Sequence, residues 1–421
     1  MSDLNETPKG NRIRIAFFGL RNAGKSTLVN AFTGQPIAIV SDVPGTTTDP
    51  VSKAMEILSL GPCLVTDTAG LDDEGELGRQ RVEKSLKVLE TTDIAVWVWN
   101  GKNPDKRSGD RFSVFEAACR SRHVVLMEFF RGDSVEKLKK KIAAVKLADE
   151  APGLLDGLVE NGDRVLCVVP IDESAPKGRL ILPQQQVIRE CLDRHLTASV
   201  CQPEELDDCL RLESACLKGR LLVVTDSQAF GRVSQVLAED KRSDDSKDRT
   251  IVLTSFSILF ARQKGDLGEY AEGLKALAAL KDGDAVLIAE GCTHHRQCND
   301  IGSVKIPKAL EKLSGKKLKF AFASGNGFLD SCASPASDQE IASPLSEIAS
   351  PFALIVQCGG CMLTRREMLR RIGLAKASGI PIVNYGMVLA AAAGLPVGRL
   401  VSQVSSPRPS FVSSSQEVKS S

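Results

Sequence analysis

The sequence predicts an α/β protein of three domains, an N-terminal P-loop domain followed by two parallel-sheet α/β domains. The first observation is length, because 421 residues correspond to about 2.8 domains at roughly 150 residues each. The second is a glycine-rich loop between the first strand and the first helix. The third is a strand–turn–helix pattern that repeats after residue 282. With 43% apolar and 25% charged residues, the chain can bury a core in each domain.

Charge and hydropathy exclude several classes of protein. Lys and Arg number 54 and Asp and Glu 53, so the net charge is +1 and no overall field attracts nucleic acid or acidic lipid. The longest apolar run, residues 251–261, is too short for a bilayer span. Residues 1–11 are polar, lack the apolar core of a secretory signal and are expected to be disordered. We therefore expect no nucleic-acid or membrane partner, and a reducing compartment.

Cysteine is abundant, with 12 residues in a chain that carries no secretory signal. A disulfide framework is not expected there, and most free cysteines are small buried hydrophobes. Four of them have spacings of ten, eight and seven residues, which match no common metal motif, and burial is the interpretation for these: Cys191, Cys201, Cys209 and Cys216.

The first domain begins with a phosphate-binding motif. Residues 12–19 form an apolar strand, GLRNAGKS follows from Gly19 to Ser26, and residues 27–32 continue as a helix. Backbone N–H groups of such a loop cradle phosphate, Lys25 adds a charge at the β/γ-phosphates, and the Ser26 hydroxyl is a ligand for Mg²⁺. The nucleotide-binding residues expected here are Gly19, Asn22, Ala23, Gly24, Lys25, Ser26 and Thr27.

Three further segments follow in chain order. Residues 44–49 offer hydroxyls for a switch that orders around Mg²⁺ and a γ-phosphate, with Thr47 as the expected Mg²⁺ ligand. Asp67-Thr68-Ala69-Gly70 brings a carboxylate to the Mg²⁺ shell and the Gly70 N–H to the γ-phosphate. The expected catalytic residues are therefore Lys25, Thr47, Asp67 and Gly70. The third segment, Ser174-Ala175, follows a predicted strand at 165–170 and completes the expected nucleotide site.

In this order and spacing, the motifs resemble the G domain of the family that includes Era and MnmE, over residues 12–178. The resemblance implies GTP as the nucleotide, and K⁺ held by Asn22 in place of an arginine finger. The residue type alone also allows Asn22 to be a turn residue that tolerates left-handed backbone. Leu71 follows the D-T-A-G segment, so a Ras-like water-positioning Gln is absent and slow hydrolysis is expected.

The base-reading motif N-K-x-D should follow the predicted strand at 124–129. The sequence there is Phe130-Arg131-Gly132-Asp133, which keeps only the Asp. Its carboxylate can accept hydrogen bonds from N1–H and N2–H₂ of guanine, each worth about 1.5–3 kcal/mol. Residues 100–105 contain suitable residue types but follow the preceding strand, so we do not assign the base to them. We expect weaker guanine discrimination than a complete motif gives.

The middle domain, residues 179–280, shows predicted strands at 221–225 and 251–256 and helices at 186–195 and 268–280. It carries no catalytic constellation, and its expected role is packing and dimerisation.

The third domain, residues 281–400, has predicted strands at 285–289, 318–323, 353–356 and 380–383. Sites in parallel sheets collect at the carboxyl ends of strands, where Cys292, Cys358 and Cys361 all lie. With His294 they could form a Cys₃His zinc site or hold a [4Fe–4S] cluster. A redox pair or inert core cysteines are the further alternatives. We expect a helix to begin at Cys361 and to favour the negative charge of a thiolate-bound cluster.

The G domain together with E-G-C-T-H-H, C-G-G-C-M-L-T-R-R-E-M and N-Y-G resembles the HydF family of [FeFe]-hydrogenase maturation GTPases, over residues 12–400. The resemblance implies a homodimer, a [4Fe–4S] cluster on Cys292, Cys358 and Cys361 with His294 nearby, and a carrier role. The cargo is a two-iron precursor, received from two radical-SAM maturases and delivered to the hydrogenase. The implied location is the cytoplasm, or the matrix of a hydrogen-producing organelle.

Two features depart from this family. Gln357 stands where the family usually has His before C-x-x-C, and residues 332–351 form a low-complexity insertion. His294, an exogenous group or a carboxylate such as Asp193 are the candidates for the fourth cluster ligand. The Ser-rich residues 401–421 are expected to be a disordered tail. Alternative functions are an RNA- or ribosome-associated GTPase of the Era/MnmE kind and a zinc-stabilised regulatory GTPase.

Overall fold

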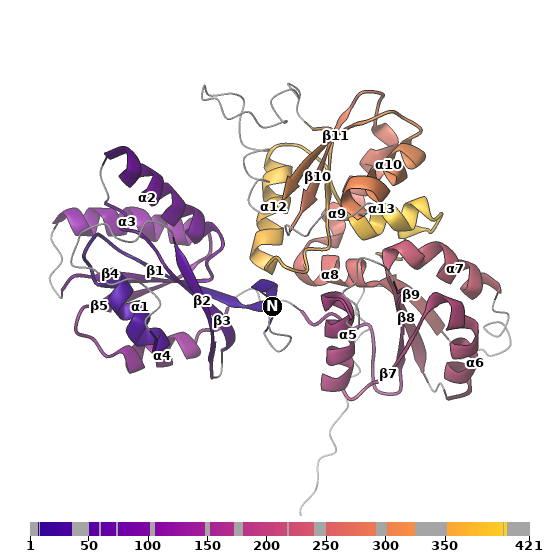
Figure 1. Ribbon diagram of the computed structural model, residues 1–421, viewed down its shortest axis with the longest axis horizontal. Coiled ribbons are helices and arrows are strands. Elements are labelled where there is room, and N and C mark those ends of the chain that lie inside the picture. The colour runs from indigo at the N-terminus through magenta and orange to yellow at the C-terminus, as the bar shows by residue number, and fades with distance from the viewer. Residues whose placement is uncertain are drawn as a thin grey trace, which may run out of the picture. The chain divides into compact units, whose positions relative to one another are not determined.

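The computed structural model shows two compact units, which are described separately (Figure 1). The first contains Met1–Glu150 with Met362–Glu367, and the second contains Ala151–Cys361 with Met368–Ser421. The structure describes residues 7, 9–35, 50–58, 60–72, 75–101, 106–147, 152–171, 180–216, 219–239, 250–291, 301–324, 352–398 and 400–401. No helix among these residues is long and apolar enough to cross a membrane.

The first unit contains a five-stranded sheet with the order β2-β3-β1-β4-β5. Its strands are β1 (Ile13–Phe18), β2 (Val51–Ile57), β3 (Gly61–Asp67), β4 (Ile94–Trp99) and β5 (Val125–Phe130). Only β2 is antiparallel to its neighbour, while β1, β3, β4 and β5 run parallel.

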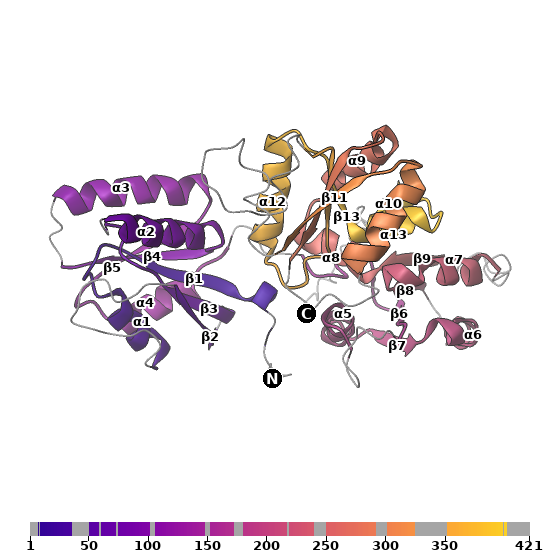
Figure 2. The same ribbon diagram turned by 45° about the horizontal axis from the view of Figure 1, so that its top comes forward.

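Helices α1 (Lys25–Thr33) and α4 (Val135–Ala143) cover one face of this sheet (Figure 2). Helices α2 (Gly75–Glu90) and α3 (Lys106–Ser121) cover the other face. Alternation along β1 explains both layers, because Phe17 packs with the α1 and α4 side whereas Phe18 packs with Phe115 of α3. The phosphate loop therefore leaves a strand that is buried on both faces and leads directly into α1.

The second unit begins with an all-parallel sheet of order β7-β6-β8-β9. Its strands are β6 (Arg164–Val168), β7 (Thr197–Cys201), β8 (Arg220–Thr225) and β9 (Thr250–Ser255). Its helices are α5 (Leu182–Asp193), α6 (Leu206–Cys216), α7 (Phe230–Glu239) and α8 (Phe256–Lys264).

The position of β6 corrects the sequence interpretation. We expected the strand at 165–170 to end the P-loop domain, but β6 pairs with β7 and β8 and is a central strand of the second sheet. The first compact unit accordingly ends at Glu150, not at residue 178. Apolar character predicted the strand correctly and carries no information about its partner strands.

The third sheet is also parallel and has the order β11-β10-β12-β13, which confirms the predicted fold class. Its strands are β10 (Ala285–Glu290), β11 (Lys319–Ser324), β12 (Leu354–Gln357) and β13 (Ile382–Asn384). Its helices are α9 (Leu267–Ala276), α10 (Ile306–Ser314), α12 (Arg365–Ala377) and α13 (Tyr385–Ala392), and a π-helical turn, η6 (Ile301–Lys305), precedes α10.

The second and third sheets share one hydrophobic core. Val224 of β8, Phe260 of α8, Val286 of β10 and Val388 of α13 all belong to a single buried cluster. The two sheets therefore form one body, and the carboxyl ends of strands from both can meet.

Candidate functional site

The phosphate loop has the backbone that its sequence predicts. Asn22 and Gly24 have φ angles of 59° and 91°, both in the left-handed region, and α1 begins at Lys25. Lys25 is 7% exposed, and its ammonium donates to the carbonyl oxygens of Gly19 (3.2 Å) and Leu20 (2.8 Å). The left-handed conformation accounts for an Asn at position 22, as the turn-residue interpretation requires.

The two expected Mg²⁺ ligands described by the structure lie together. The Ser26 hydroxyl donates to Asp67 Oδ2 (2.6 Å), and Asp67 Oδ1 is buried without a hydrogen-bond partner among the described residues. Burial raises the pKa of Asp67, and the Ser26 hydrogen bond and the Lys25 charge oppose that shift. A buried carboxylate oxygen with no partner, beside a hydroxyl, fits a Mg²⁺ ion.

The D-T-A-G segment packs directly against the phosphate loop. Leu71 N–H donates to the Gly19 carbonyl (3.2 Å), and Arg21 N–H donates to Asp72 Oδ1 (2.6 Å). A Cβ on Gly70 would lie 2.9 Å from the Arg21 nitrogen, so only glycine fits there. The two loops are thereby held in register around the expected phosphate position.

The loop expected to read the base contacts Asn100, a residue that the sequence interpretation set aside. Asp133 Oδ2 accepts a hydrogen bond from the Phe130 N–H (3.2 Å), which closes the turn after β5. The Arg131 guanidinium donates to Asn100 Oδ1 (3.3 Å), so Asn100 at the end of β4 joins the loop. Positions 100 and 131 are 31 residues apart in the sequence, so the sequence alone does not indicate this hydrogen bond.

Several predicted site residues lie outside the described residues, namely Thr47, Ser174, Ala175, Cys292 and His294. The strand that precedes Ser174-Ala175 is β6, which belongs to the second sheet.

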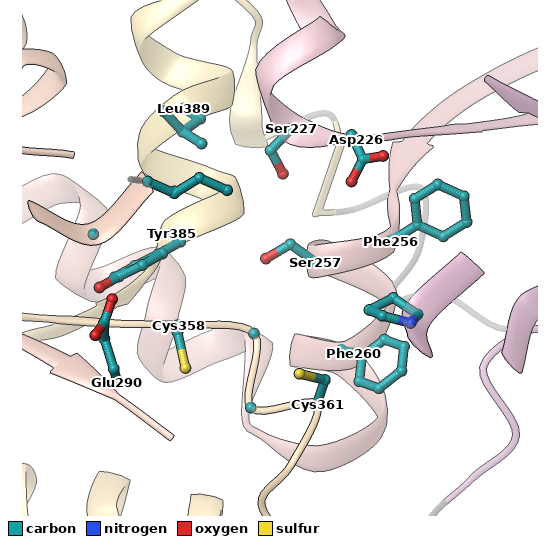
Figure 3. Close-up of a pocket in the computed structure, with 15 residues that line it drawn as sticks. Asp226, Ser227, Phe256, Ser257, Phe260, Glu290, Cys358, Cys361, Tyr385 and Leu389 are labelled. Atoms are coloured by element: carbon teal, nitrogen blue, oxygen red, sulfur yellow. The ribbon is translucent and has the colours of Figure 1, made fainter. Parts of the chain in front are cut away.

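The second unit contains a cavity of about 250 Å³ between the carboxyl ends of its two parallel sheets (Figure 3). Asp226 and Ser227 follow β8, Phe256 follows β9, Glu290 ends β10, and Tyr385 follows β13. The two cysteines of the C-x-x-C motif, Cys358 and Cys361, line the same cavity directly after β12.

This position is a topological switch point. The connection after β10 leads to β11 on one side, whereas β12 and β13 lie on the other side. Ligands of open α/β sheets bind in the crevice that such a reversal leaves beyond the strand ends. The sequence placed Cys358 and Cys361 after the end of a strand correctly, and the sheet order adds that they lie at the crevice between β10 and β12.

Glycine is required at one of the two positions between the cysteines. Gly360 has φ 67°, and a Cβ there would lie 2.4 Å from Met368 Sδ. Gly359 is outside the left-handed region, and a Cβ there would lie 3.3 Å from the Ser257 hydroxyl oxygen, its nearest neighbour. The tight turn carries both cysteines to the cavity. Gln357, where the family usually has His, is buried, donates to Met368 Sδ and does not line the cavity.

Backbone donors surround the Cys358 sulfur. Its Sγ accepts a hydrogen bond from the Gly291 N–H (3.1 Å). Burial raises the pKa of the Cys358 thiol, and the N–H groups of Gly360 and Gly291, with the charge of Arg371, act in the opposite direction. Donors directed at sulfur favour a thiolate, which is the form that binds metal.

The expected helix at Cys361 is not found. The helix α12 begins at Arg365, and the Thr364 hydroxyl accepts the Glu367 N–H at its start (3.3 Å). Residues 361–364 instead form a turn that leads from the cavity to the helix. The positive end of α12 therefore begins four residues beyond Cys361. The expectation that a helix N-terminus at Cys361 compensates the negative charge of a cluster is wrong.

A lysine that the sequence analysis missed lies against this turn. Lys264, at the end of α8, is 3% exposed and donates to the carbonyl oxygens of Cys361 (3.2 Å) and Gly360 (3.4 Å). Burial lowers the pKa of Lys264 to about 8, while attraction to the thiols of Cys361 and Cys358 opposes this shift. No local motif marks Lys264, because it is separated from Cys361 by 97 positions.

Within the described residues, no group of three or more His, Cys, Asp or Glu is placed to hold a metal ion. Two of the expected ligands, Cys358 and Cys361, do share the cavity. Asp193 ends α5, pairs with Arg189 (2.9 Å) and does not line it. The carboxylates that do line it are Asp226 and Glu290.

Family models match all three parts of the chain. The hydrogen maturase F dimerization domain matches residues 154–265, and the hydrogen maturase F tetramerization domain matches residues 268–402. A third model, the 50S ribosome-binding GTPase, matches residues 14–127. The chain belongs to the HydF family. The resemblance inferred from the motifs is thereby confirmed, and this HydF protein carries an oligomerisation region after its GTPase domain.

Curated relatives of this HydF protein are GTPases. The tRNA modification GTPase MnmE of Zymomonas mobilis is 29% identical over 183 residues, covering 43% of this chain and 38% of the relative. MnmE of Thermus thermophilus is 38% identical over 92 residues (22% and 21%), and GTPase Der of Wolinella succinogenes is 36% identical over 124 residues (27% and 26%). The matches thus span between about a fifth and two fifths of these relatives.

Among solved structures, Era in complex with MgGDPNP and 16S ribosomal RNA is similar, with 15% identity and a TM-score of 0.25. It covers 45% of this chain and 91% of that chain.

Proposed function

We propose that this HydF protein hydrolyses GTP slowly and carries a [4Fe–4S] cluster on which it holds a two-iron precursor for [FeFe]-hydrogenase. The observation that carries the proposal is the shared cavity of Cys358 and Cys361 at the switch point of the third sheet. The hydrogen maturase F domain matched over residues 268–402 contains that cavity's cysteines and also Cys292.

In the GTPase step, Lys25 binds the β/γ-phosphates after leaving the two carbonyl oxygens to which it now donates. Ser26 and Asp67 would hold Mg²⁺, which supplies charge stabilisation at the phosphates. The Gly70 N–H contacts the γ-phosphate, with Thr47 as the second hydroxyl ligand and Asn22 as the ligand for K⁺. Leu71 in place of a water-positioning Gln supports slow turnover.

In the carrier step, Cys292, Cys358 and Cys361 would hold the cluster, which supplies an iron open to a bridging ligand. Gly291 directly precedes Cys292 in the chain, and its N–H donates to Cys358 Sγ, which supports the grouping of these cysteines. His294, two residues beyond Cys292, is the proposed exchangeable fourth ligand. The proposed partners are the hydrogenase and two radical-SAM maturases, in the cytoplasm or in the matrix of a hydrogen-producing organelle.

A homodimer is proposed through the second sheet, whose domain matches the hydrogen maturase F dimerization domain. The edge strand β7 and its flanking helices expose apolar side chains, which supports this edge as the contact. These are Leu192 (65% exposed), Val200 (50%) and Leu212 (71%).

The test is metal analysis of the full chain, purified under strict anaerobiosis, with iron, sulfide and zinc measured together. Iron and sulfide are expected in the unaltered protein, and Cys292→Ser, Cys358→Ser and Cys361→Ser should each lose them. Cys298→Ser and the half-buried Cys209→Ser are the matched controls and should retain both.

Zinc without iron would contradict the proposal and favour a zinc-stabilised regulatory GTPase. Loss of iron in Cys298→Ser as complete as in Cys292→Ser would show that the ligand set is wrong. His294→Ala should retain iron and change the EPR signal, because an imidazole ligand can be replaced by water or thiol.

A further inference from the structure

The cysteine cavity must accommodate negative charge in a largely apolar setting. Phe256, Phe260 and Leu389 line it together with the two cysteines. A thiolate-bound iron–sulfur cluster is a net anion and becomes more negative on reduction. A buried charge is costly unless an opposite charge or hydrogen-bond donors compensate for it.

Lys264 is placed to supply that compensation. Lys264 is the last residue of α8, the helix whose Phe256 and Phe260 line the cavity, and its ammonium lies 5.3 Å from the centre of the Phe260 ring. The ammonium donates to two consecutive carbonyls of the cysteine turn, at Gly360 and Cys361. The ammonium thus supplies positive charge next to Cys361, where we had expected the N-terminus of a helix to supply it.

The thiols act on the same ammonium. The groups whose negative charge stabilises protonated Lys264 are Cys361 and Cys358. A second buried cation, Arg371, acts on Cys358 and donates to the Glu290 carbonyl oxygen (3.4 Å). Lys264 differs from Arg371 because its hydrogen bonds hold the cysteine turn itself.

We propose that Lys264 is a positioning residue of the cysteine site, which holds the C-G-G-C turn and sets the reduction potential of the bound cluster by compensating its negative charge. The inference rests on the proposed function, because it presupposes an iron–sulfur cluster on Cys358 and Cys361. A cation buried beside the cluster favours the more negative, reduced state. Removing that charge must therefore shift the one-electron equilibrium toward the oxidised cluster.

A structural role alone makes a different prediction. Lys264 is in the last turn of α8, where a cation also interacts favourably with the helix dipole. If that were its whole role, substitution would lower the free energy of unfolding and would leave the potential of the bound cluster unchanged. The potential therefore separates the two roles.

The experiment is an EPR-monitored redox titration of the full chain, purified and reconstituted anaerobically. Lys264→Met removes the charge and the hydrogen bonds to the Gly360 and Cys361 carbonyl oxygens. Lys264→Gln retains a donor without the charge, and Lys264→Arg retains the charge. The matched control is Lys275→Met, which removes an exposed lysine of α9 whose ammonium pairs with Glu272 (2.7 Å).

Lys264→Met and Lys264→Gln should disfavour reduction at least tenfold, which corresponds to about 59 mV for one electron. Lys264→Arg and Lys275→Met should stay close to the unaltered protein. Iron content should persist in Lys264→Gln, so the measurement does not depend on the more disruptive Met variant.

Three results would overturn the inference. They are an unchanged potential in both uncharged variants, an equal shift in Lys275→Met, or loss of iron in Lys264→Arg as complete as in Lys264→Met. The failure of the proposed function looks different, because the unaltered protein would then contain no iron–sulfur cluster to titrate.

Discussion

Replacing Gly360 by alanine should weaken the cysteine turn far more than replacing its neighbour Gly359. Gly360 has φ 67°, a left-handed conformation that costs an L-residue about 1–2 kcal/mol. Its Cβ would also lie 2.4 Å from Sδ of Met368, a fully buried side chain, and overpacking costs about 1–3 kcal/mol. Gly360→Ala should therefore lower the free energy of unfolding by about 2–5 kcal/mol.

Gly359→Ala is the matched control. Its backbone is outside the left-handed region, and the nearest atom to its Cβ would be the Ser257 hydroxyl oxygen, at 3.3 Å. The expected effect is within about 1 kcal/mol of zero. Adding Met368→Ala to Gly360→Ala should relieve the overpacking and leave the backbone cost, so the two substitutions should be non-additive.

Two optical probes separate the units in a urea titration. Far-UV circular dichroism reports the whole chain, whereas the only two tryptophans, Trp97 and Trp99, both lie on β4 of the first unit. The destabilisation should appear in circular dichroism and leave the tryptophan transition unchanged. Equal effects of Gly359→Ala and Gly360→Ala would refute the reasoning, as would a shift of the tryptophan transition in Gly360→Ala.

Four further outcomes follow from the same structure. Lys25→Ala should abolish GTP hydrolysis, because its charge at the β/γ-phosphates is lost, and unchanged phosphate release would contradict the site assignment. Exchanging K⁺ for Na⁺ should slow hydrolysis if Asn22 holds the cation, and equal rates would leave Asn22 as a turn residue only. The ratio of dissociation constants for ATP and GTP should be small and fall further in Asp133→Ala, whereas a strong GTP preference that survives this substitution would place the base elsewhere. Burial raises the pKa of Cys167 to about 12, so the folded state keeps a proton that the unfolded state loses. Stability should fall above about pH 9 by about 1.4 kcal/mol per pH unit from this thiol. The fall should be smaller in Cys167→Ala than in the control Cys209→Ala, and identical pH profiles for the two would contradict the assignment.

The nucleotide site was predictable because its chemistry is local in sequence. Lys25 and Ser26 are consecutive, and the strand-to-helix transition that positions them is fixed by a glycine at position 24 with φ 91°. Asp67 could be added because a strand end in an α/β sheet delivers its next residue to the same edge as the phosphate loop. The burial of Asp67 and its raised pKa required the packed structure.

The partner of β6 was not predictable in the same way. An apolar run shows that a strand is buried and contains no record of which strand lies beside it. The motif order placed β6 in the first sheet, whereas its register pairs Val165 with Ala198 and Leu222. The sheet to which β6 belongs is decided by its pairing with strands that are distant in sequence, and a single sequence gives little information about such pairing.

The cysteine site depends on residues that are distant in sequence from the C-x-x-C motif. Sequence spacing grouped Cys358 and Cys361 and predicted domain limits at residues 280 and 281. The cavity crosses those limits, because Phe256 and Phe260 line it and come from α8, the helix that follows the second sheet and ends at Lys264. Since Lys264 holds the turn from that side, residues 281–400 alone would contain the cysteines without the cation. Helix α8 explains both the shared core and the position of the cysteine turn. Its side chains pack into the core that the two sheets share, and its last residue, Lys264, donates a hydrogen bond to the cysteine turn.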